Sequence, residues 1–528
     1  MTREERLEVA FKIAGIGFIA LALSSADAVR SLLGTVWGLV HEGSLYDLRG
    51  RLTIAGFLFA HALATFLAGV VLTRLAQPLS ERFRPPEAEA PALGSEQFLP
   101  FAVLLLGVTL LLPLLLAVPF ALLRPSNVSF GGGILIVPVG FAGFILIAGA
   151  RPLAKLLRRG MRLPQSEAGL GVPGLALGVL VVGMHFCVYE PWTILGALTT
   201  TVPAVAAPDG ALADLRFWRY ETLVTSPVRL ALGLGLVCYA GRVAMRLSCR
   251  SMEAEAEAPP SGGFSADMWL ALAVFVAVVY IALRYVTYCI HAPFLTLFHV
   301  EWLATAETWA YHLVLPVGSA VAILCVAGRQ AWKVGRRLCP EPFWQREPGS
   351  DATAVGQMAR VYSEVAVTVI ALFFAIGLLS QAFGRHFVAI APADGSGVAS
   401  SFSSYAPEHV IAAAAAIVAL LLRGEIARLF WRHHGSDAHV PASRRAAALR
   451  PWLVLMGLWY VLSTGPDVVY WFGARSGREP CPWAALLKAV PGLVLLLAAP
   501  WVARRLSYGP LIPAIRSAIG RRLNYGRD

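Results

Sequence analysis

Apolar residues gather into about twelve long runs along the chain, separated by stretches rich in charged residues, Pro and Gly. A helix needs on the order of 20 residues to cross a hydrocarbon core about 30 Å thick, and the runs are close to this length. Polarity does not alternate within a run as it does in barrel strands, so the pattern predicts membrane-spanning helices. The predicted spans are 7–28, 53–75, 98–122, 132–150, 172–195, 228–248, 268–290, 309–330, 362–383, 408–430, 451–472 and 484–503.

Every second run ends in a similar basic segment. The clearest is VAGRQAWKV (326–334), in which Arg329 and Lys333 lie about one helical turn apart. The related segments are AGARPLAKL (148–156) with Arg151 and Lys155, YAGRVAMRL (239–247) with Arg242 and Arg246, and the looser LTRLAQPL (72–79), LRGEIARL (422–429) and APWVARRL (499–506). We expect the six named basic residues to contact anionic lipid headgroups at the cytoplasmic surface.

This spacing predicts an all-α, polytopic integral membrane protein with about twelve transmembrane helices arranged as six tandem helical hairpins. The longest external loops are expected over 196–227 and 384–407. The predicted parts are hairpin unit 1 (1–80), an acidic Pro/Ala linker (81–97), hairpin unit 2 (98–160), hairpin unit 3 (161–250), a second acidic linker (251–267), hairpin unit 4 (268–338), a cytoplasmic loop (339–361), hairpin unit 5 (362–434), hairpin unit 6 (435–505) and a basic amphipathic C-terminal tail (506–528).

Composition agrees with a membrane protein. The chain is 57% hydrophobic and 14% charged, whereas about a quarter of the residues of a soluble domain are charged. The net charge is +12, and most Lys and Arg fall in the N-terminus, the inter-unit loops and the C-terminus. This positive-inside bias predicts that both termini are cytoplasmic, in what the composition indicates is a bacterial plasma (inner) membrane. Such a charge distribution serves topology and anionic lipid headgroups, so we expect no nucleic-acid partner.

Ionisable residues inside spans are costly and invite a named partner. Asp467 and Lys488 lie on the two runs of unit 6, about equally far from the middle of their short loop, so we predict an ion pair with a structural role. Glu190 is expected to meet Arg229 in unit 3. Arg284 is expected to meet Glu301 or Glu307 in unit 4, although the longer loops constrain these pairings less.

Polar residues near mid-span are few. His61, Thr65, Thr109 and His185 are candidates for the lining of a polar cavity, although each histidine also fits a packed core. Five prolines are predicted to interrupt spans, as in the broken helices that form transporter substrate sites. They are Pro113, Pro119, Pro138, Pro316 and Pro491.

A metal site and a cofactor are not expected. His291, His299, Glu301 and His312 cluster in the external turn of unit 4, but their spacing fits no compact ligand motif. The seven cysteines form no CxxC pair, and the chain lacks the common nucleotide-binding and hydrolase motifs. No loop exceeds about 35 residues, which is too short for a soluble catalytic domain.

Three functions fit such a chain. The first is a facilitated or lipid-directed transporter, without ion coupling because no acid lies at mid-depth in a span. The second is a membrane-embedded scaffold or accessory subunit with protein partners. The third is an interfacial lipid-modifying enzyme, whose acids and histidines would converge at the external face. The sequence identifies no catalytic residue, substrate or oligomeric state, and leaves enzymatic activity open.

Overall fold

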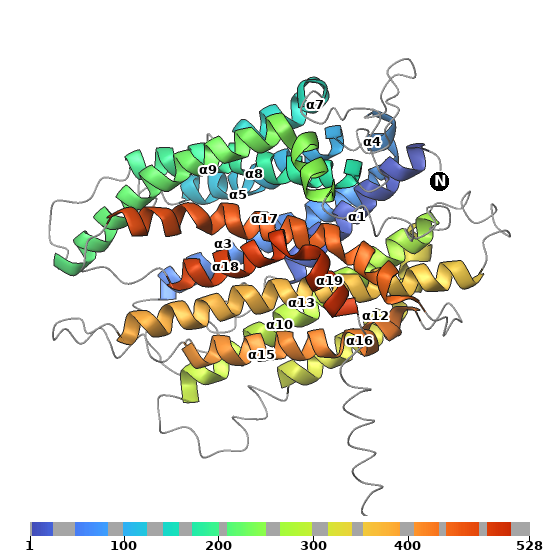
Figure 1. Cartoon of the computed structure of the whole chain (residues 1–528). Helices are drawn as coiled ribbons and strands as arrows, with labels where there is room; N and C mark the ends of the chain where they lie inside the picture. Colours follow the sequence, from blue (N-terminus) through green and yellow to red (C-terminus); the bar gives the residue numbers. More distant parts are fainter. Residues whose placement is uncertain are drawn as a thin grey trace, which may run out of the picture. The chain divides into compact units, whose positions relative to one another are not determined.

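The described part of the chain is helical (Figure 1). The structure, a computed structural model, describes residues 3–24, 48–82, 99–123, 141–157, 172–199, 209–249, 265–297, 315–339, 352–390, 406–431, 440–474 and 483–507. Over these ranges no residue lies in a strand. Each predicted apolar run overlaps one of these ranges, so the prediction of an all-α chain is confirmed for them.

The helices before residue 250 belong to the first six predicted runs. They are α1 (Arg3–Leu23), α3 (Leu48–Arg74), α4 (Ala76–Arg82), α5 (Leu99–Leu123), a helix over 141–148, α7 (Ala150–Leu157), α8 (Val172–Thr199) and α9 (Asp209–Cys249). The later helices are α10 (Ala266–Leu297), α12 (Leu315–Leu338), α13 (Ala352–Ile390), α15 (Ala406–Leu421), α16 (Arg423–Trp431), α17 (Ala442–Ala474), α18 (Trp483–Leu497) and α19 (Ala499–Ser507).

Four described helices are long and apolar enough to cross a membrane. The qualifying segments are Thr222–Leu247 of α9, Ala266–Arg284 of α10, Gly356–Ala382 of α13 and Ala442–Tyr470 of α17. Two bent pairs, α3 with α4 and α18 with α19, raise the number of candidate spans to six if each pair is one span. Many large apolar side chains are exposed, among them Val469 (73%) and Phe141 (62%), as expected of a lipid-facing surface. These features indicate a membrane location.

Two sequence predictions about helix ends and prolines were wrong. α9 begins at Asp209, inside the predicted external loop 196–227. α5 runs through Pro113 and Pro119, and α18 runs through Pro491. A proline removes one backbone hydrogen bond, but membrane helices tolerate this loss where neighbouring groups compensate.

The remaining two prolines also give no evidence of an interruption. Pro316 is the second residue of α12, where a helix has no use for the missing N–H. Pro138 lies outside the described residues.

Helices are interrupted instead at the basic segments that end the second runs. The breaks are at Leu75 between α3 and α4, Gly149 before α7, Tyr239 within α9, Leu422 between α15 and α16, and Ala498 between α18 and α19. The axis turns by 68° at the first break and by 87° at the last. α12 carries the same kind of segment and continues without a break.

The local sequence accounts for the positions of these interruptions. Pro78, Pro152 and Pro500 follow their breaks by two or three residues. Each lacks an N–H, and its ring clashes with the carbonyl four residues earlier, so the helix axis must turn. Gly241 and Gly424 occupy the corresponding places after the breaks at residues 239 and 422.

The basic segments bury small residues and expose their charges. The buried positions, four residues apart, are Ala76 and Ser80, Ala150 and Ala154, Ala240 and Ala244, Ala331 and Gly335, and Ala499 and Ala503. Small residues at this spacing let one helix approach another closely. At Gly335, an added Cβ would lie 2.7 Å from the Cβ of Ala271 in α10.

Glycines also allow close contact between helices of consecutive runs. Four pairs face each other, Gly15 with Gly69, Gly107 with Gly143, Gly183 with Gly233 and Gly457 with Gly492. A Cβ added to Gly183 would lie 2.8 Å from the carbonyl oxygen of Gly233, and the reverse distance is 2.9 Å. Real side chains do not approach so closely, so these contacts require glycine.

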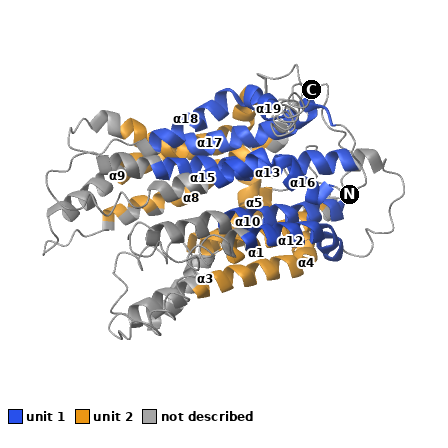
Figure 2. Ribbon diagram, turned by 90° about the horizontal axis from the view of Figure 1, so that it is seen from below, with its two compact units in different colours: residues 1, 251–461, 476–528 blue, residues 2–250, 462–475 orange. Residues whose placement is uncertain are grey.

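The chain divides into two compact units (Figure 2). Unit 1 comprises residues 1, 251–461 and 476–528, and unit 2 comprises residues 2–250 and 462–475. The core of unit 1 includes Phe275 and Phe430, whose ring centroids are 5.2 Å apart. In unit 2, the buried Phe11 of α1 meets Phe101 of α5 edge to face at 4.9 Å.

Candidate functional site

A charged cluster in unit 2 joins three helices. We define the Arg229 cluster as Glu190 of α8, Ser226 and Arg229 of α9, and Asp467 near the end of α17. Arg229 Nη2 donates a hydrogen bond to Asp467 Oδ1, and its Nη1 lies 3.8 Å from Glu190 Oε1. With two carboxylates around one guanidinium, the cluster carries one excess negative charge when all three groups are ionised.

The side chains of the Arg229 cluster are largely buried within the protein, and some of their polar atoms have no hydrogen-bond partner among the described residues. The side chains of Glu190, Arg229 and Asp467 are 6%, 17% and 22% exposed. Glu190 Oε2, Ser226 Oγ and Arg229 Nε are buried and have no hydrogen-bond partner among the described residues. Unsatisfied groups of this kind in a low-dielectric setting are costly and commonly hold a water or a bound polar group.

The predicted pairings have different outcomes. The structure brings Glu190 and Arg229 together, with Asp467, for which the sequence predicted a different partner, as a third member. Asp467 lies in compact unit 2 and Lys488 in compact unit 1, so the pairing predicted for them within hairpin unit 6 stays a prediction. The pairing of Arg284 also stays a prediction, because Glu301 and Glu307 lie outside the described residues.

The four predicted cavity-lining residues are not brought together by any described contact. Thr109 is exposed, and its hydroxyl donates to the carbonyl of Leu105 in its own helix at 2.8 Å. His185 stacks on Tyr189 with a centroid distance of 5.6 Å. Thr65 is buried, and the side chain of His61 lies outside the described part of the chain. A shared polar cavity therefore stays a prediction.

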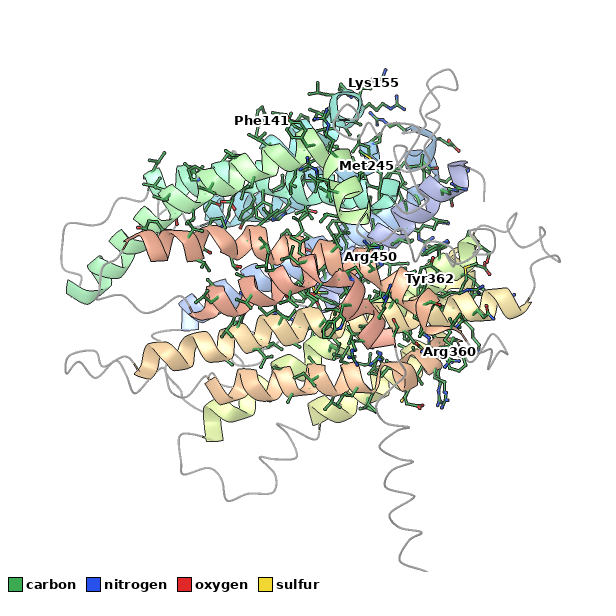
Figure 3. All side chains as sticks on the ribbon, in the orientation of Figure 1. Phe141, Lys155, Met245, Arg360, Tyr362 and Arg450 are labelled. Atoms are coloured by element: carbon green, nitrogen blue, oxygen red, sulfur yellow. The ribbon has the colours of Figure 1, made fainter. Side chains whose placement is uncertain are left out.

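All six basic residues assigned to lipid headgroups are exposed, namely Arg151, Lys155, Arg242, Arg246, Arg329 and Lys333. Figure 3 shows Lys155 projecting from the helical surface of unit 2. The guanidinium of Arg242 lies 5.5 Å from the ring centroid of Tyr239, an arrangement common where aromatic and basic side chains share an interface. Exposure leaves these residues accessible to headgroups, but headgroup binding itself stays a prediction.

The histidines and the acid that cluster in the external turn of hairpin unit 4 lie outside the part of the chain whose side chains the structure describes. These residues are His291, His299, Glu301 and His312. Across the described ranges, no three His, Cys, Asp or Glu side chains gather in a group that could hold a metal ion.

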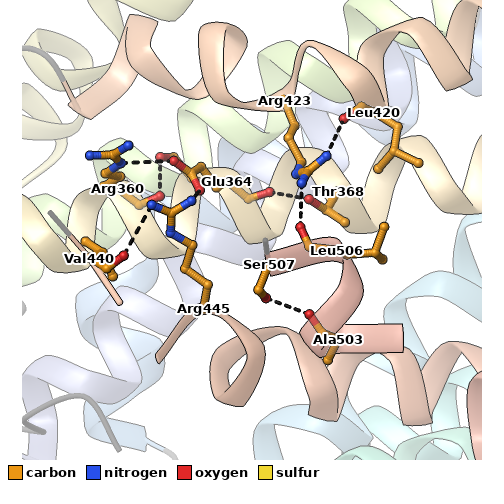
Figure 4. A network of polar contacts seen from close by, with 11 residues as sticks. Arg360, Glu364, Thr368, Leu420, Arg423, Val440, Arg445, Ala503, Leu506 and Ser507 are labelled. Carbon is orange, nitrogen blue, oxygen red and sulfur yellow. Dashed lines mark hydrogen bonds and ion pairs between the residues drawn. The ribbon is translucent and has the colours of Figure 1, made fainter. Parts of the chain in front are cut away.

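A second charged cluster, in unit 1, was missed by sequence reasoning. We define the Arg445 cluster as Arg360 and Glu364 of α13, Arg423 of α16 and Arg445 of α17 (Figure 4). Glu364 accepts hydrogen bonds from Arg360 Nε at 3.1 Å and from Arg445 Nη1 at 3.0 Å. Two guanidinium groups thus pair with one carboxylate, and Arg423 interacts with it electrostatically, so the four side chains carry an excess of two positive charges.

Backbone carbonyls near helix ends supply the remaining contacts. Arg423 donates to the carbonyls of Leu420 at 3.0 Å and Leu506 at 2.5 Å, and Arg445 donates to that of Val440 at 3.3 Å (Figure 4). The bond to Leu506 links the start of α16 to the end of α19, and the other two bonds are local to the starts of α16 and α17. The cluster therefore fixes helix ends as well as gathering charge.

A weak signal for this cluster exists in the sequence. Arg360 and Glu364 are spaced i, i+4 where the apolar run 362–383 begins, and Glu364 lies just inside it. That spacing predicts one local pair. The approach of Arg423 and Arg445, from helices 59 and 81 residues later in the numbering, could not be seen without the fold.

Comparison of the chain with protein-family models, with curated protein sequences and with solved structures returned no match.

Proposed function

We propose that this chain is a facilitated or lipid-directed membrane transporter without ion coupling. The observation that carries the proposal is the Arg229 cluster. It places three charged side chains and several unsatisfied polar atoms on helices of which two include candidate spans. Charges at such positions are expensive, and they commonly mark a substrate or ion pathway.

The cluster has a chemistry suited to a polar or anionic group. Arg229 is held by Asp467 and lies near Glu190, so an incoming carboxylate or phosphate would compete with these acids for the guanidinium. Ser226 Oγ and Glu190 Oε2 offer further hydrogen-bonding capacity. Exchange of partners at Arg229 would allow binding and release without a coupled ion.

We also propose twelve spans arranged as six hairpins. Facing glycines link the two runs of hairpin units 1, 2, 3 and 6, and the second run is interrupted at its basic segment in five of the six hairpin units. Arg445 and Asp467 lie about six turns apart on α17, roughly 33 Å, which matches the thickness of a hydrocarbon core. This spacing supports opposite membrane faces for these two residues.

The positive-inside pattern gives the orientation within this proposal. Both termini and the basic segments would face the cytoplasm of a bacterial cell. The Arg445 cluster would then lie near the cytoplasmic headgroups, and the Arg229 cluster toward the external face.

A reconstitution assay tests the transport proposal. Full-length protein in liposomes that contain fluorescent phosphatidylglycerol should expose inner-leaflet lipid to a quencher added outside. We expect Arg229→Gln to lower this rate about tenfold or more, and Arg428→Gln, which changes an exposed ion pair, to leave it unchanged. Wild-type protein without activity above empty liposomes would contradict lipid transport, as would a folded Arg229→Gln variant with the wild-type rate.

A scaffold or accessory subunit is the second candidate. The facing glycines favour tightly joined helices, which suit a rigid frame for partner proteins. Purification from native membranes followed by mass spectrometry distinguishes the two functions, because a scaffold should retain a partner protein in a fixed ratio. An interfacial lipid-modifying enzyme remains the third candidate, with Glu190 and Asp467 as its described acids.

A further inference from the structure

Among the described residues, the Arg445 cluster has more positive charges and donors than the one carboxylate and the carbonyls that contact it. Arg360 and Arg445 are 23% and 14% exposed, and Glu364 is 9% exposed. Arg423 interacts electrostatically with both Glu364 and Arg445. The carbonyls that accept from Arg423 and Arg445 are neutral, so they satisfy hydrogen bonds without balancing charge.

Neighbouring side chains do not restore the balance. Arg428 pairs with Glu425 at 3.0 Å, so this exposed pair adds no net charge. Arg444 adds a further cation, and its only described partner is the neutral Gln357 at 3.0 Å. The Nε atoms of Arg444 and Arg445 are both buried and have no hydrogen-bond partner among the described residues.

The residue type indicates which acceptor would complete the cluster. Arginine presents planar, paired donors that match the oxygens of a phosphate, and it stays charged under all ordinary conditions. Arg360 is held against the ring of Trp431 at 4.9 Å, and Arg423 is held by two carbonyls, so both groups are already oriented. Preorientation lowers the entropy cost of binding an anion.

We propose that the Arg445 cluster is a binding site for a phosphate group. The ligand is either the headgroup of an anionic phospholipid or a free phosphate compound. The inference does not depend on transport activity, since it concerns a different set of residues from the Arg229 cluster.

Binding of fluorescent phosphatidylglycerol to the detergent-solubilised full-length protein tests the site. Fluorescence anisotropy would report binding, and unlabelled phosphatidylglycerol, phosphatidylcholine and sodium phosphate would each be used for displacement at constant ionic strength. Displacement by phosphatidylglycerol alone identifies an anionic lipid headgroup. Displacement by sodium phosphate as well identifies a site open to free phosphate. Equal displacement by phosphatidylcholine, or no saturable binding of the probe, would overturn the proposal.

Two variants with opposite expected effects locate the binding at this cluster. Arg445→Gln removes a donor and a charge, and should weaken phosphatidylglycerol binding about tenfold. Glu364→Gln removes the competing carboxylate, and should strengthen binding severalfold even if it lowers stability. The control is Arg428→Gln, one of the exposed pair on α16, which should bind as the wild type does.

The opposite signs separate ligand binding from a structural role. If Arg445→Gln fails to fold, Glu364→Gln still decides the question. Weaker binding by Glu364→Gln, or an equal loss in Arg428→Gln and Arg445→Gln, would overturn the assignment.

Discussion

The Arg229 cluster and the Arg445 cluster use the same residue types in opposite proportions. In the first, two acids surround one arginine, and three polar atoms are left without partners. In the second, two of three arginines pair with one acid, and carbonyls at helix ends accept from Arg423 and Arg445. The difference teaches that the balance of charges decides how an anion could enter, because it must displace an acid from Arg229 but can be added to the Arg445 cluster without displacing one. The first suits exchange of partners at its arginine, and the second suits an added anion.

The largest effect on stability should come from Arg229→Gln. This change removes the guanidinium that pairs with Asp467 and Glu190, and breaking a buried pair on one side costs about 3–5 kcal/mol. Thermal unfolding in detergent would measure the loss. Arg229→Gln combined with Asp467→Asn should recover part of it, because one uncompensated charge is gone. Equal destabilisation in the single and double variants would show that the ion pair is not the cause.

Glu364→Gln should cost less, about 2–3 kcal/mol, because neighbouring carbonyls still accept from Arg423 and Arg445. Added phosphatidylglycerol should restore part of this stability in the Arg445 cluster, because an anion replaces the missing charge. The same lipid should not rescue Arg229→Gln. Rescue of both variants to the same extent would remove the distinction between the two clusters.

Gly233→Ala tests whether close packing of α8 and α9 positions the Arg229 cluster. Its new Cβ would lie 2.9 Å from the carbonyl oxygen of Gly183, so we expect a loss of about 1–2 kcal/mol. Gly235→Ala, two residues further on α9, meets nothing within 4 Å and is the matched control. It should be neutral or slightly stabilising, since Ala favours helix over Gly. Similar unfolding temperatures for the two variants would contradict the packing argument.

The smallest effect should come from Arg428→Ala, beside the Arg445 cluster. Arg428 and Glu425 are 52% and 60% exposed, so their pair contributes at most about 0.5 kcal/mol. An unfolding temperature close to that of the wild type is expected. A loss as large as that of Glu364→Gln would mean that exposure does not separate the two kinds of ion pair in this region.

The sequence predicted local features better than assembled ones. Apolar runs predicted helices because run length and hydrophobicity are properties of single segments. The proximity of Glu190 and Arg229 could be proposed because they lie on consecutive runs. Asp467 could not be added to them, because it lies more than 200 residues further along the chain. The Arg445 cluster was missed for the same reason.

The bends were not predicted because the sequence analysis expected prolines inside the apolar runs to interrupt helices and did not consider those in the basic segments. Those inside the apolar runs, Pro113, Pro119 and Pro491, were expected to break helices, and the helices continue through them. Pro78 and Pro500 stand in the basic segments at the ends of runs, where they coincide with turns of 68° and 87°.

The central proposal is that the loop before α17 is cytoplasmic and the loop after it is external, and cysteine accessibility tests it most directly. In a background without native cysteines, Ser436→Cys would probe the loop before α17, and Ser476→Cys the loop after it. A membrane-impermeant maleimide added to intact cells should label position 476 and should reach position 436 only after permeabilisation. Labelling of both positions in intact cells, or of position 436 alone, would contradict the account.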